Sequence, residues 1–321
     1  MTLVDWRDVP SEVVQPLLLA ERRHALDTLH WDLSPSLKAV ELARQRGDLA
    51  GLLLYDAKGR PVGWAFYLLA NRLLQIGGLS APTAGGLRTL LDRVLESPEA
   101  QLAHGVSCFL EAKTRSLTSA LTRLRFDIQR HVYLEATLTT PWPSPSTLSD
   151  ARPLELGDAP ALVRLLARGY AGERVAQTFA PNARMDEWAH YAGQLLNGPA
   201  VGTWRPDQSF AVTMPDGQLA AAVVTTEIAR GIAHIAQVVV DPAFRRKGLA
   251  RRLLLSAAAA ATTQGAKRLT LMVGEANGHA RALYDGLGFA ERGAFIHATR
   301  GPVPRTLGGV TVRATGLRAS A

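Results

Sequence analysis

The residues best suited to chemistry lie in the stretch VVVDPAFRRKGLARRLL, residues 238–254. An apolar run ends at Asp241-Pro242, a basic loop follows, and a leucine- and alanine-rich pattern predicts a helix directly after it. Backbone N–H groups at the start of a helix point outward with the positive end of the helix dipole and therefore attract anions. Gly248 and Ala250 let an anion approach the backbone. Positive charge comes from Arg245, Arg246 and Lys247. The segment is typical of a loop that binds a diphosphate.

A second segment, NGHARALYDGLGF at residues 277–289, follows at a suitable distance. Asn277 before a predicted helix is ordinarily an N-cap, and Tyr284 at helical spacing is ordinarily a core residue. Taken alone, the hexapeptide RRKGLA is more typical of a solvated basic turn than of a phosphate-binding loop. The combination of the two segments favours a binding site, because a strand, a proline, a basic loop and a helix occur in this order and the second segment follows them.

Around these motifs the sequence predicts a unit that begins with helices and continues as an antiparallel meander. Helices are expected over 158–169 and 186–197, and a hairpin over 209–214 and 218–228 around the turn Pro215-Asp216-Gly217. The elements expected after it are a strand over 232–240, a helix over about 248–264, a strand over 269–273, a helix over 278–287 and a strand over 289–298.

The first part of the chain repeats this outline in weaker form, with strands expected over 51–55, 62–69, 73–79 and 106–110 and a helix over 86–96. Residues 139–150, TTPWPSPSTLSD, have the proline content of an extended connector. The sequence therefore predicts an α/β (α+β) protein of two tandem domains, each a mixed, mostly antiparallel sheet flanked by helices. The expected boundaries are 1–138, a linker 139–150, 151–300, and a basic tail 301–321 with an edge strand within 309–314.

The first domain lacks the basic loop. The segment from Pro82 to Leu90 is shorter than its counterpart and carries one arginine, Arg88, inside the expected helix, and Leu121 takes the place of Tyr284. We therefore interpret residues 1–138 as a degenerate copy that keeps the fold and is either structural or a wall of the acceptor site. Glycine pairs at 77–78 and 85–86 leave open a phosphate site without cations.

At the two motifs the chain resembles the GNAT superfamily of acyl-CoA-dependent N-acyltransferases, over residues 151–298. The family's loop, Arg or Gln followed by x-x-Gly-x-Gly or Ala, is matched by Arg245, Gly248 and Ala250. Its later pattern is matched by Asn277, Ala280, Leu283, Tyr284, Gly288 and Phe289. One position differs from the family's loop, because Arg246 stands where glycine is common. Tandem copies occur in the family, including mycothiol-forming acetyltransferases, but the similarity to these is one of architecture and includes no substrate signature.

The resemblance implies an acetyl-CoA cosubstrate and direct transfer to an amine. The strand before the loop would splay from its neighbour, and Val238, Val239 and Val240 would hold the pantetheine arm. The diphosphate would lie on the amides of Arg246, Lys247, Gly248, Leu249 and Ala250. Asn277 would lie near the pantetheine, and Tyr284 would protonate the departing thiolate. The motif does not identify the base, for which the candidates are Glu227, His234 and, more weakly, Glu275; each has an ordinary structural explanation as well.

Composition limits the remaining possibilities. The net charge is +8, with all of the excess after residue 150, and Cys108 is the single cysteine, which excludes a multi-cysteine metal site; no metal is expected. The start of the chain does not resemble a signal peptide, and its apolar runs are too short to span a membrane, so we expect a soluble, cytoplasmic protein. No nucleic-acid-binding motif accompanies the positive charge. We expect a monomer or homodimer that acts on a small-molecule or peptide amine.

Two functions remain open. The first is an acetyl-CoA-dependent N-acetyltransferase that is active in its second half. The alternative is a non-catalytic CoA-binding regulatory or sensor module. Compatible acceptors include a peptide N-terminus, a protein lysine, a polyamine, an aminoglycoside and a small metabolite.

Overall fold

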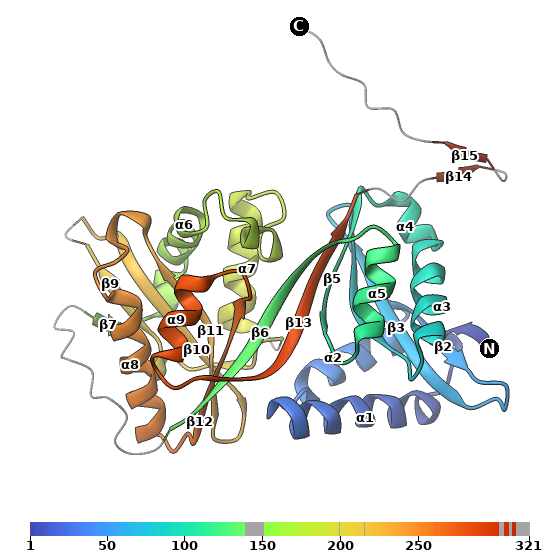
Figure 1. Ribbon diagram of the computed structural model, residues 1–321, viewed down its shortest axis with the longest axis horizontal. Helices are drawn as coiled ribbons and strands as arrows, with labels where there is room; N and C mark the ends of the chain where they lie inside the picture. Colours follow the sequence, from blue (N-terminus) through green and yellow to red (C-terminus); the bar gives the residue numbers. More distant parts are fainter. Residues whose placement is uncertain (139–150, 199, 215, 302–304, 308–309, 313–321) are drawn as a thin grey trace, which may run out of the picture. The chain divides into compact units, whose positions relative to one another are not determined.

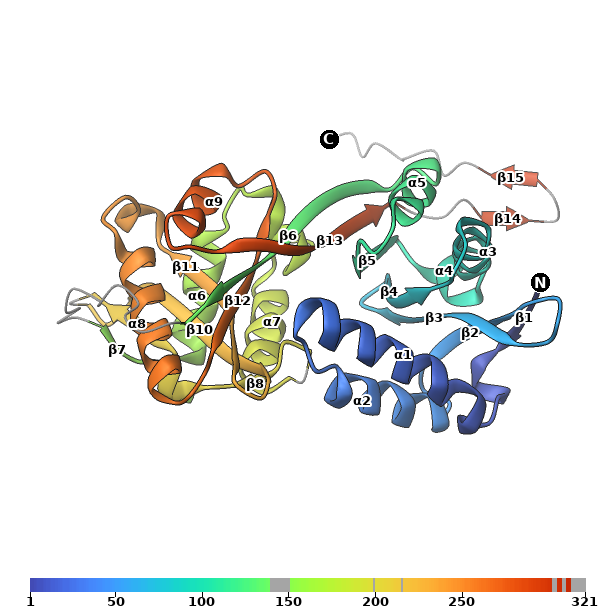
Figure 2. The same cartoon turned by 60° about the horizontal axis from the view of Figure 1, so that its bottom comes forward.

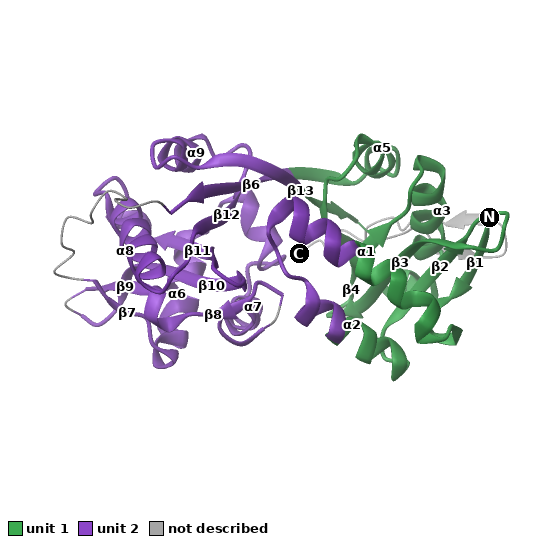
Figure 3. Ribbon diagram, turned by 90° about the horizontal axis from the view of Figure 1, so that it is seen from below, with its two compact units in different colours: residues 1–20, 39–129, 295–321 green, residues 21–38, 130–294 purple. Residues whose placement is uncertain are grey.

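The computed structural model describes residues 1–138, 151–198, 200–214, 216–301, 305–307 and 310–312 (Figure 1). The predicted linker 139–150 lies outside the described residues, as does most of the tail. The chain divides into two compact units (Figure 3). Unit 1 comprises Met1–Ala20, Ala39–Gln129 and Phe295–Ala321, and unit 2 comprises Glu21–Lys38 and Arg130–Ala294. The units are therefore not continuous in sequence, and each contains segments from the other half of the chain.

Unit 2 contains a sheet in the order β6-β12-β11-β10-β9-β7, with β8 paired to β10. Its strands are β6 (Asp127–Thr137, in unit 2 from residue 130), β7 (Ala151–Pro153), β8 (Thr203–Trp204), β9 (Phe210–Thr213), β10 (Leu219–Ala229), β11 (Ile232–Val240) and β12 (Arg268–Gly274). Its helices are α6 (Ala159–Gly169), α7 (Met185–Asn197), α8 (Leu249–Thr263) and α9 (Gly278–Asp285). Apart from the parallel pair β11 and β12, the pairs of this sheet are antiparallel.

The two faces of this sheet carry separate cores, because successive residues of a strand point to opposite faces. On β10, Ala221 and Val223 face a core that includes the leucines of α8, whereas Ala222 and Val224 face the core beneath α6 and α7. The loop before α8 and the ends of α6 and α7 therefore come from opposite layers of unit 2 (Figure 2).

Strand β6 completes the sheet of unit 2, although it comes from the first half of the sequence. It pairs antiparallel with β12 from Thr137↔Arg268 to His131↔Gly274. Its side chains Val132, Leu134 and Ala136 are buried in the same core as α8. The core of the second half is therefore closed by residues that precede the predicted linker.

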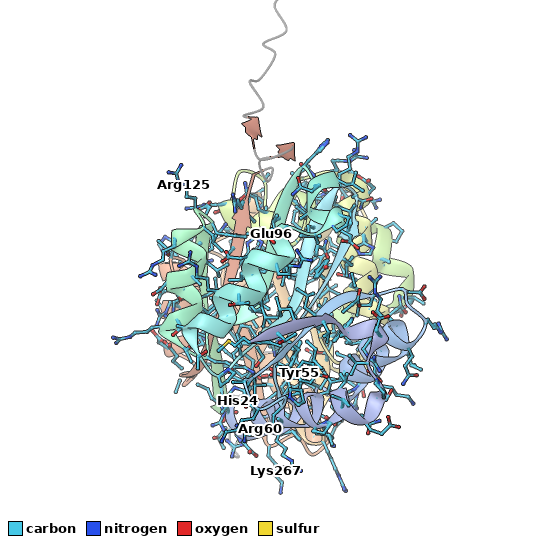
Figure 4. All side chains as sticks on the ribbon, turned by 90° about the vertical axis from the view of Figure 1, so that its right-hand side faces the viewer. His24, Tyr55, Arg60, Glu96, Arg125 and Lys267 are labelled. Atoms are coloured by element: carbon cyan, nitrogen blue, oxygen red, sulfur yellow. The ribbon has the colours of Figure 1, made fainter. Side chains whose placement is uncertain are left out.

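Unit 1 repeats the plan with the order β1-β2-β3-β4-β5-β13. Its strands are β1 (Thr2–Asp5), β2 (Ala50–Tyr55), β3 (Pro61–Ala70), β4 (Leu73–Ser80), β5 (Gly105–Glu111) and the last part of β13 (Ala290–Arg300). Its helices are α3 (Ala84–Leu95), α4 (Pro98–Leu102) and α5 (Arg115–Arg123). Here Ile296 and Ala298 of β13 are buried in the core of the first half. Charged side chains such as Arg60, Glu96 and Arg125 are exposed and project outward (Figure 4).

Two helices near the start of the chain belong to both units. Helix α1 (Ser11–Leu29) and helix α2 (Ser34–Gln45) begin or end in unit 2, and Figure 3 shows each of them changing colour along its length. The segment between them supplies His30 and Trp31 to unit 2.

The predicted fold class, a mixed α/β protein with a repeated plan, is confirmed. The strand predicted within 309–314 is observed at Val310–Val312 as β15, paired with β14 (Arg305–Leu307). Among the described residues, no helix is both long and apolar enough to cross a membrane.

Candidate functional site

Strands β11 and β12 separate halfway along their length. They pair in parallel from Ile232↔Arg268 to Ile235↔Leu271, and beyond this point β11 stays with β10 while β12 stays with β6. The register of β10 and β11 shifts between Val224 and Thr225, opposite Ala236, as at a β-bulge, which bends a strand. The edge of β11 on the side of β12 therefore has no strand partner over residues 236–240 among the described residues, and the resemblance implies such a separation.

The loop after β11 presents its backbone amides outward. Asp241 starts a short 3₁₀ helix, Pro242–Phe244, by accepting a hydrogen bond from the Ala243 amide at 3.0 Å. Arg246 and Gly248 have φ of 64° and 76°, and α8 begins at Leu249 without a side-chain cap. Within the described residues, the amides of residues 246–251 have no hydrogen-bond acceptor. An uncapped helix start of this kind binds anions.

The three cations of this loop have different surroundings. Arg245 donates to the carbonyl of Gly169 at 2.6 Å and lies 3.6 Å from a carboxylate oxygen of Glu173, so it ties the loop to the end of α6. Lys247 Nζ lies 4.9 Å from the centre of the Phe244 ring. Arg246 is exposed and has no ion-pair partner among the described residues. Arg246 and Lys247 are therefore the cations available to a ligand.

The backbone at Arg246 explains why glycine is common there in the family that the sequence resembles. A left-handed conformation costs a residue with a Cβ about 1–2 kcal/mol, whereas glycine adopts it freely. We expect Arg246→Gly to raise the free energy of unfolding by about 0.5–1 kcal/mol, after the extra entropy of glycine in the unfolded chain is subtracted. Urea unfolding measures the change. The neighbouring Lys247→Gly, at a residue with negative φ, should instead destabilise the protein; equal effects of the two variants would contradict the explanation.

Asn277 and Tyr284 are brought to the same part of unit 2 by α9. The Asn277 side chain accepts a hydrogen bond from the Ala280 amide at 3.1 Å, so it caps α9. Tyr284 is 5% exposed and packs edge to face on Phe289, with ring centres 5.8 Å apart. Burial raises the pKa of the Tyr284 hydroxyl well above its ordinary value, with the nearby Tyr170 adding to the shift. Tyr284 is therefore protonated at neutral pH and able to donate a proton.

The two carboxylates proposed as bases are both held by arginines. Glu227 lies at the end of β10, opposite Ala233, on the paired side of the point where β11 leaves β12, and forms an ion pair with Arg205 at 2.8 Å. Glu275 is exposed and forms an ion pair with Arg130. The structure does not bring either of them together with Tyr284.

His234 is enclosed in the sheet of unit 2. It is 3% exposed, its Nδ1 lies 2.9 Å from Thr270 Oγ1, and its ring packs against those of Trp31 and Tyr133. Burial lowers the pKa of His234 to about 3. The ring is therefore neutral at physiological pH and too weakly basic to take a proton from an ammonium group.

This burial predicts a pH dependence of stability. Below pH 6.5 the unfolded chain protonates His234, whereas the folded chain does not until about pH 3, so its contribution to stability is lost as the pH falls through this window. The slope approaches about 1.4 kcal/mol per pH unit. We expect His234→Phe to unfold in urea with a weaker decline between pH 7 and pH 5 than the unchanged protein. The control is His279→Phe, because His279 is exposed. If the free energy of unfolding of His234→Phe declines between pH 7 and pH 5 as steeply as that of the unchanged protein, the prediction is wrong.

A buried polar network lies beside the point where β11 and β12 separate, and the sequence motifs do not predict it. Gln237 Oε1 accepts hydrogen bonds from the Tyr170 hydroxyl at 2.7 Å and the Val238 amide at 3.1 Å, and its Nε2 donates to the Tyr191 hydroxyl at 3.1 Å. Burial raises the pKa of Tyr170 to about 12, so this hydroxyl remains a donor. The sequence signal was a single glutamine inside the apolar strand IAHIAQVVV.

Aromatic rings from α7 and its surroundings enclose this network. Phe179 lies 4.7 Å from Tyr191 and Trp188 lies 5.7 Å from Tyr170, measured between ring centres. Gly169, just before Tyr170, allows α6 to approach the strand, because a Cβ there would be 2.4 Å from Val239 Cγ2. The α6 and α7 layer therefore meets β11 where it leaves β12.

The corresponding place in unit 1 differs, because a side chain caps the start of its helix. Strands β4 and β5 also stop pairing, after Ile76↔Cys108. However, Thr83 Oγ1 accepts a hydrogen bond from the Gly86 amide at 3.1 Å and so caps α3. A Cβ at Gly77 would be 2.2 Å from the Phe66 ring, so this glycine makes room for a side chain. Packing therefore accounts for Gly77, and the Gly86 amide is occupied by the cap.

Comparison with known proteins finds a family that is similar to part of the chain. Residues 174–289 match the profile of the Acetyltransferase (GNAT) family. A GCN5-related N-acetyltransferase from Sphaerobacter thermophilus is similar in structure at a TM-score of 0.61, with 19% identity and 82% of each chain covered. A tandem GNAT protein from the clavulanic acid biosynthesis pathway gives 0.55 at 15% identity, covering 80% of this chain and 84% of that one.

A third structure, an acetyltransferase of the GNAT family from Colwellia psychrerythraea, gives a TM-score of 0.53 at 13% identity and covers 93% of this chain and 99% of that one. No curated protein matches the sequence. The identities to solved structures are low, so these similarities concern the fold. Residues 174–289 are thus similar to the GNAT acetyltransferase family, and the fold of the chain is similar to that of a tandem GNAT protein.

Proposed function

We propose that the protein is an acetyl-CoA-dependent N-acetyltransferase that acts in the second half of its chain. The observation that supports this most strongly is the open edge of β11 where it separates from β12, followed closely along the chain by the uncapped start of α8. A pantetheine arm carries amides that can pair with such a strand edge, and a diphosphate fits the outward amides of the loop. The acceptor is proposed to be an intracellular small-molecule or peptide amine.

The residues present suit this cosubstrate. Val238 and Val240 lie in the separated part of β11, with Val239 between them packed in the core on one face. Gly248 has no atom within 4 Å of the place where a Cβ would be, so the loop is open at that point. Asn277 and Tyr284 lie at the start and near the end of α9. When bound, acetyl-CoA would supply the activated acyl group.

The chain's own groups would carry out the remaining steps. A backbone N–H of the separated edge of β11 is suited to polarise the carbonyl, and Tyr284, kept protonated by burial, to donate its proton to the leaving thiolate. The acceptor must arrive as a neutral amine, because Glu227 and Glu275 are bound to arginines and His234 is a weak base. We therefore propose that water, not one of these side chains, takes the proton of the amine.

The test is a panel of amine acceptors with acetyl-CoA, followed by thiol release. Once an acceptor is found, we expect Tyr284→Phe to lower kcat by about 10²-fold or more, the usual contribution of a positioned acid. The calorimetric Kd for CoA should be unchanged, since the ring remains. Tyr55→Phe, in the first unit, is the matched control. Equal turnover of Tyr284→Phe and the control would remove the acid role.

The second candidate function is CoA binding without turnover, as in a sensor. It is favoured by the surroundings of the three proposed bases, because Glu227 and Glu275 form ion pairs with arginines and His234 is buried. This function predicts that CoA binds while every acceptor in the panel fails to accelerate thiol release above hydrolysis.

A further inference from the structure

Unit 2 contains a pocket at the end of α8 that is remote from the diphosphate loop. Its volume is about 370 Å³, and it is lined from three places: residues 205 and 208, the β10–β11 turn with its flanking residues 227 and 230–233, and residues 264–266 after α8. Helix α8 has 15 residues, so the pocket lies about 22 Å along its axis from the loop at its start. The pocket is therefore separate from the proposed cosubstrate site.

A buried glutamine in this pocket lacks a hydrogen-bond donor. Gln208 is 3% exposed, and its Nε2 donates to Gln264 Oε1 at 3.2 Å, whereas its Oε1 has no partner among the described residues. The Gln208 carbonyl accepts a hydrogen bond from Thr225 Oγ1 at 2.8 Å, which fixes the backbone. Buried side-chain acceptors in folded proteins are nearly always satisfied. An N–H or O–H donor from a ligand would satisfy this one.

The charges around the pocket balance. Arg205 forms ion pairs with Glu227 at 2.8 Å and Asp207 at 3.2 Å. Arg230 is exposed and has no ion-pair partner among the described residues. The carbonyl end of α8 adds partial negative charge near Gln264. The pocket is thus lined by hydrogen-bond acceptors, by the Glu227 carboxylate paired with Arg205, and by a second cation, Arg230, that has no ion-pair partner among the described residues.

We propose that this pocket binds a free α-amino acid as a zwitterion. The ammonium group would donate to Gln208 Oε1 and Glu227, and the carboxylate would pair with Arg230. A ligand with two carboxylates would meet the negative groups, and a simple amine would leave Arg230 without a partner. The exposed Gln264 side chain is the group that must move to admit the ammonium group to Gln208.

The test uses the full chain without acetyl-CoA. Each common L-amino acid is screened by thermal shift, and those that raise the melting temperature are titrated by calorimetry. We expect at least one to bind, and its amide and its N-acetyl derivative, which lack the carboxylate and the ammonium group, to bind at least tenfold more weakly. Failure of every amino acid to bind, or equal binding of a derivative, would overturn the proposal.

Three variants locate the site. Arg230→Gln and Gln208→Leu should each weaken binding at least tenfold. Gln208→Leu should keep the unliganded melting temperature or raise it, because it removes the unsatisfied acceptor. Lys267→Gln removes an exposed charge adjacent in sequence to the lining residues and should leave binding unchanged. Binding that survives both Arg230→Gln and Gln208→Leu would place the amino acid elsewhere and disprove the assignment.

Discussion

Residues 151–321 produced alone are expected not to fold. This fragment lacks β6, whose Val132 and Leu134 are at most 1% exposed, and it also lacks Trp31 and Tyr133, which enclose His234. Loss of one large buried side chain costs about 2–5 kcal/mol, and the whole stability of a domain is about 5–15 kcal/mol. Circular dichroism should show no cooperative thermal transition, and calorimetry no CoA binding.

The control is the same fragment produced together with residues 1–138 as a second chain. Because residues 1–138 carry β6 and residues 151–321 carry the end of β13, each fragment supplies a strand that the other unit requires. We expect the two fragments to copurify and to regain a cooperative transition. A lone 151–321 fragment that melts cooperatively and binds CoA like the full chain would show that β6 is dispensable.

Gly248→Asp is expected to weaken CoA binding by about 100-fold or more, which corresponds to about 2.8 kcal/mol. An aspartate at the N-cap accepts hydrogen bonds from the second and third amides of the helix, so it would occupy the groups proposed for the diphosphate. Its charge would also repel phosphate at short range. Calorimetric titration with CoA measures the loss, and thermal unfolding shows whether the variant remains folded.

Gly217→Asp is the matched control for this variant. Gly217 has φ of 81°, is exposed, and has no atom within 4 Å of the place where a Cβ would be, just as at Gly248. The two variants therefore share their backbone strain and change of charge but differ in their distance from the loop. If Gly217→Asp lowers CoA affinity as much as Gly248→Asp, the loop is not the diphosphate site.

The local parts of the fold could be predicted from the sequence. The strand expected over 232–240 is observed as Ile232–Val240, and the helix expected over about 248–264 as Leu249–Thr263. Both follow from apolar runs and turn residues that neighbours in sequence determine. The basic loop could be recognised for the same reason, since its strand, turn and helix are consecutive.

Features that depend on distant partners could not be predicted. Pairing of β6 with β12 joins residues more than a hundred positions apart, and nothing in the local pattern of β6 selects that partner. The same limit applies to His234 as a candidate base. Its surroundings come from three separate segments of the chain, which contribute Trp31, Tyr133 and Thr270. The role of Arg245 also depended on a distant group, the carbonyl of Gly169.

The interchange of closing strands constrains how such a gene can be rearranged. A recombination breakpoint at the midpoint of the coding sequence would transfer a half of the chain that carries a strand of the other half's sheet. The strand that completes its own sheet would remain with the half that was left behind. Grafting either half onto an unrelated partner would therefore yield two incomplete sheets with exposed edges that invite aggregation. A lineage that inherits this arrangement must keep both halves together, even if one of them contributes no chemistry.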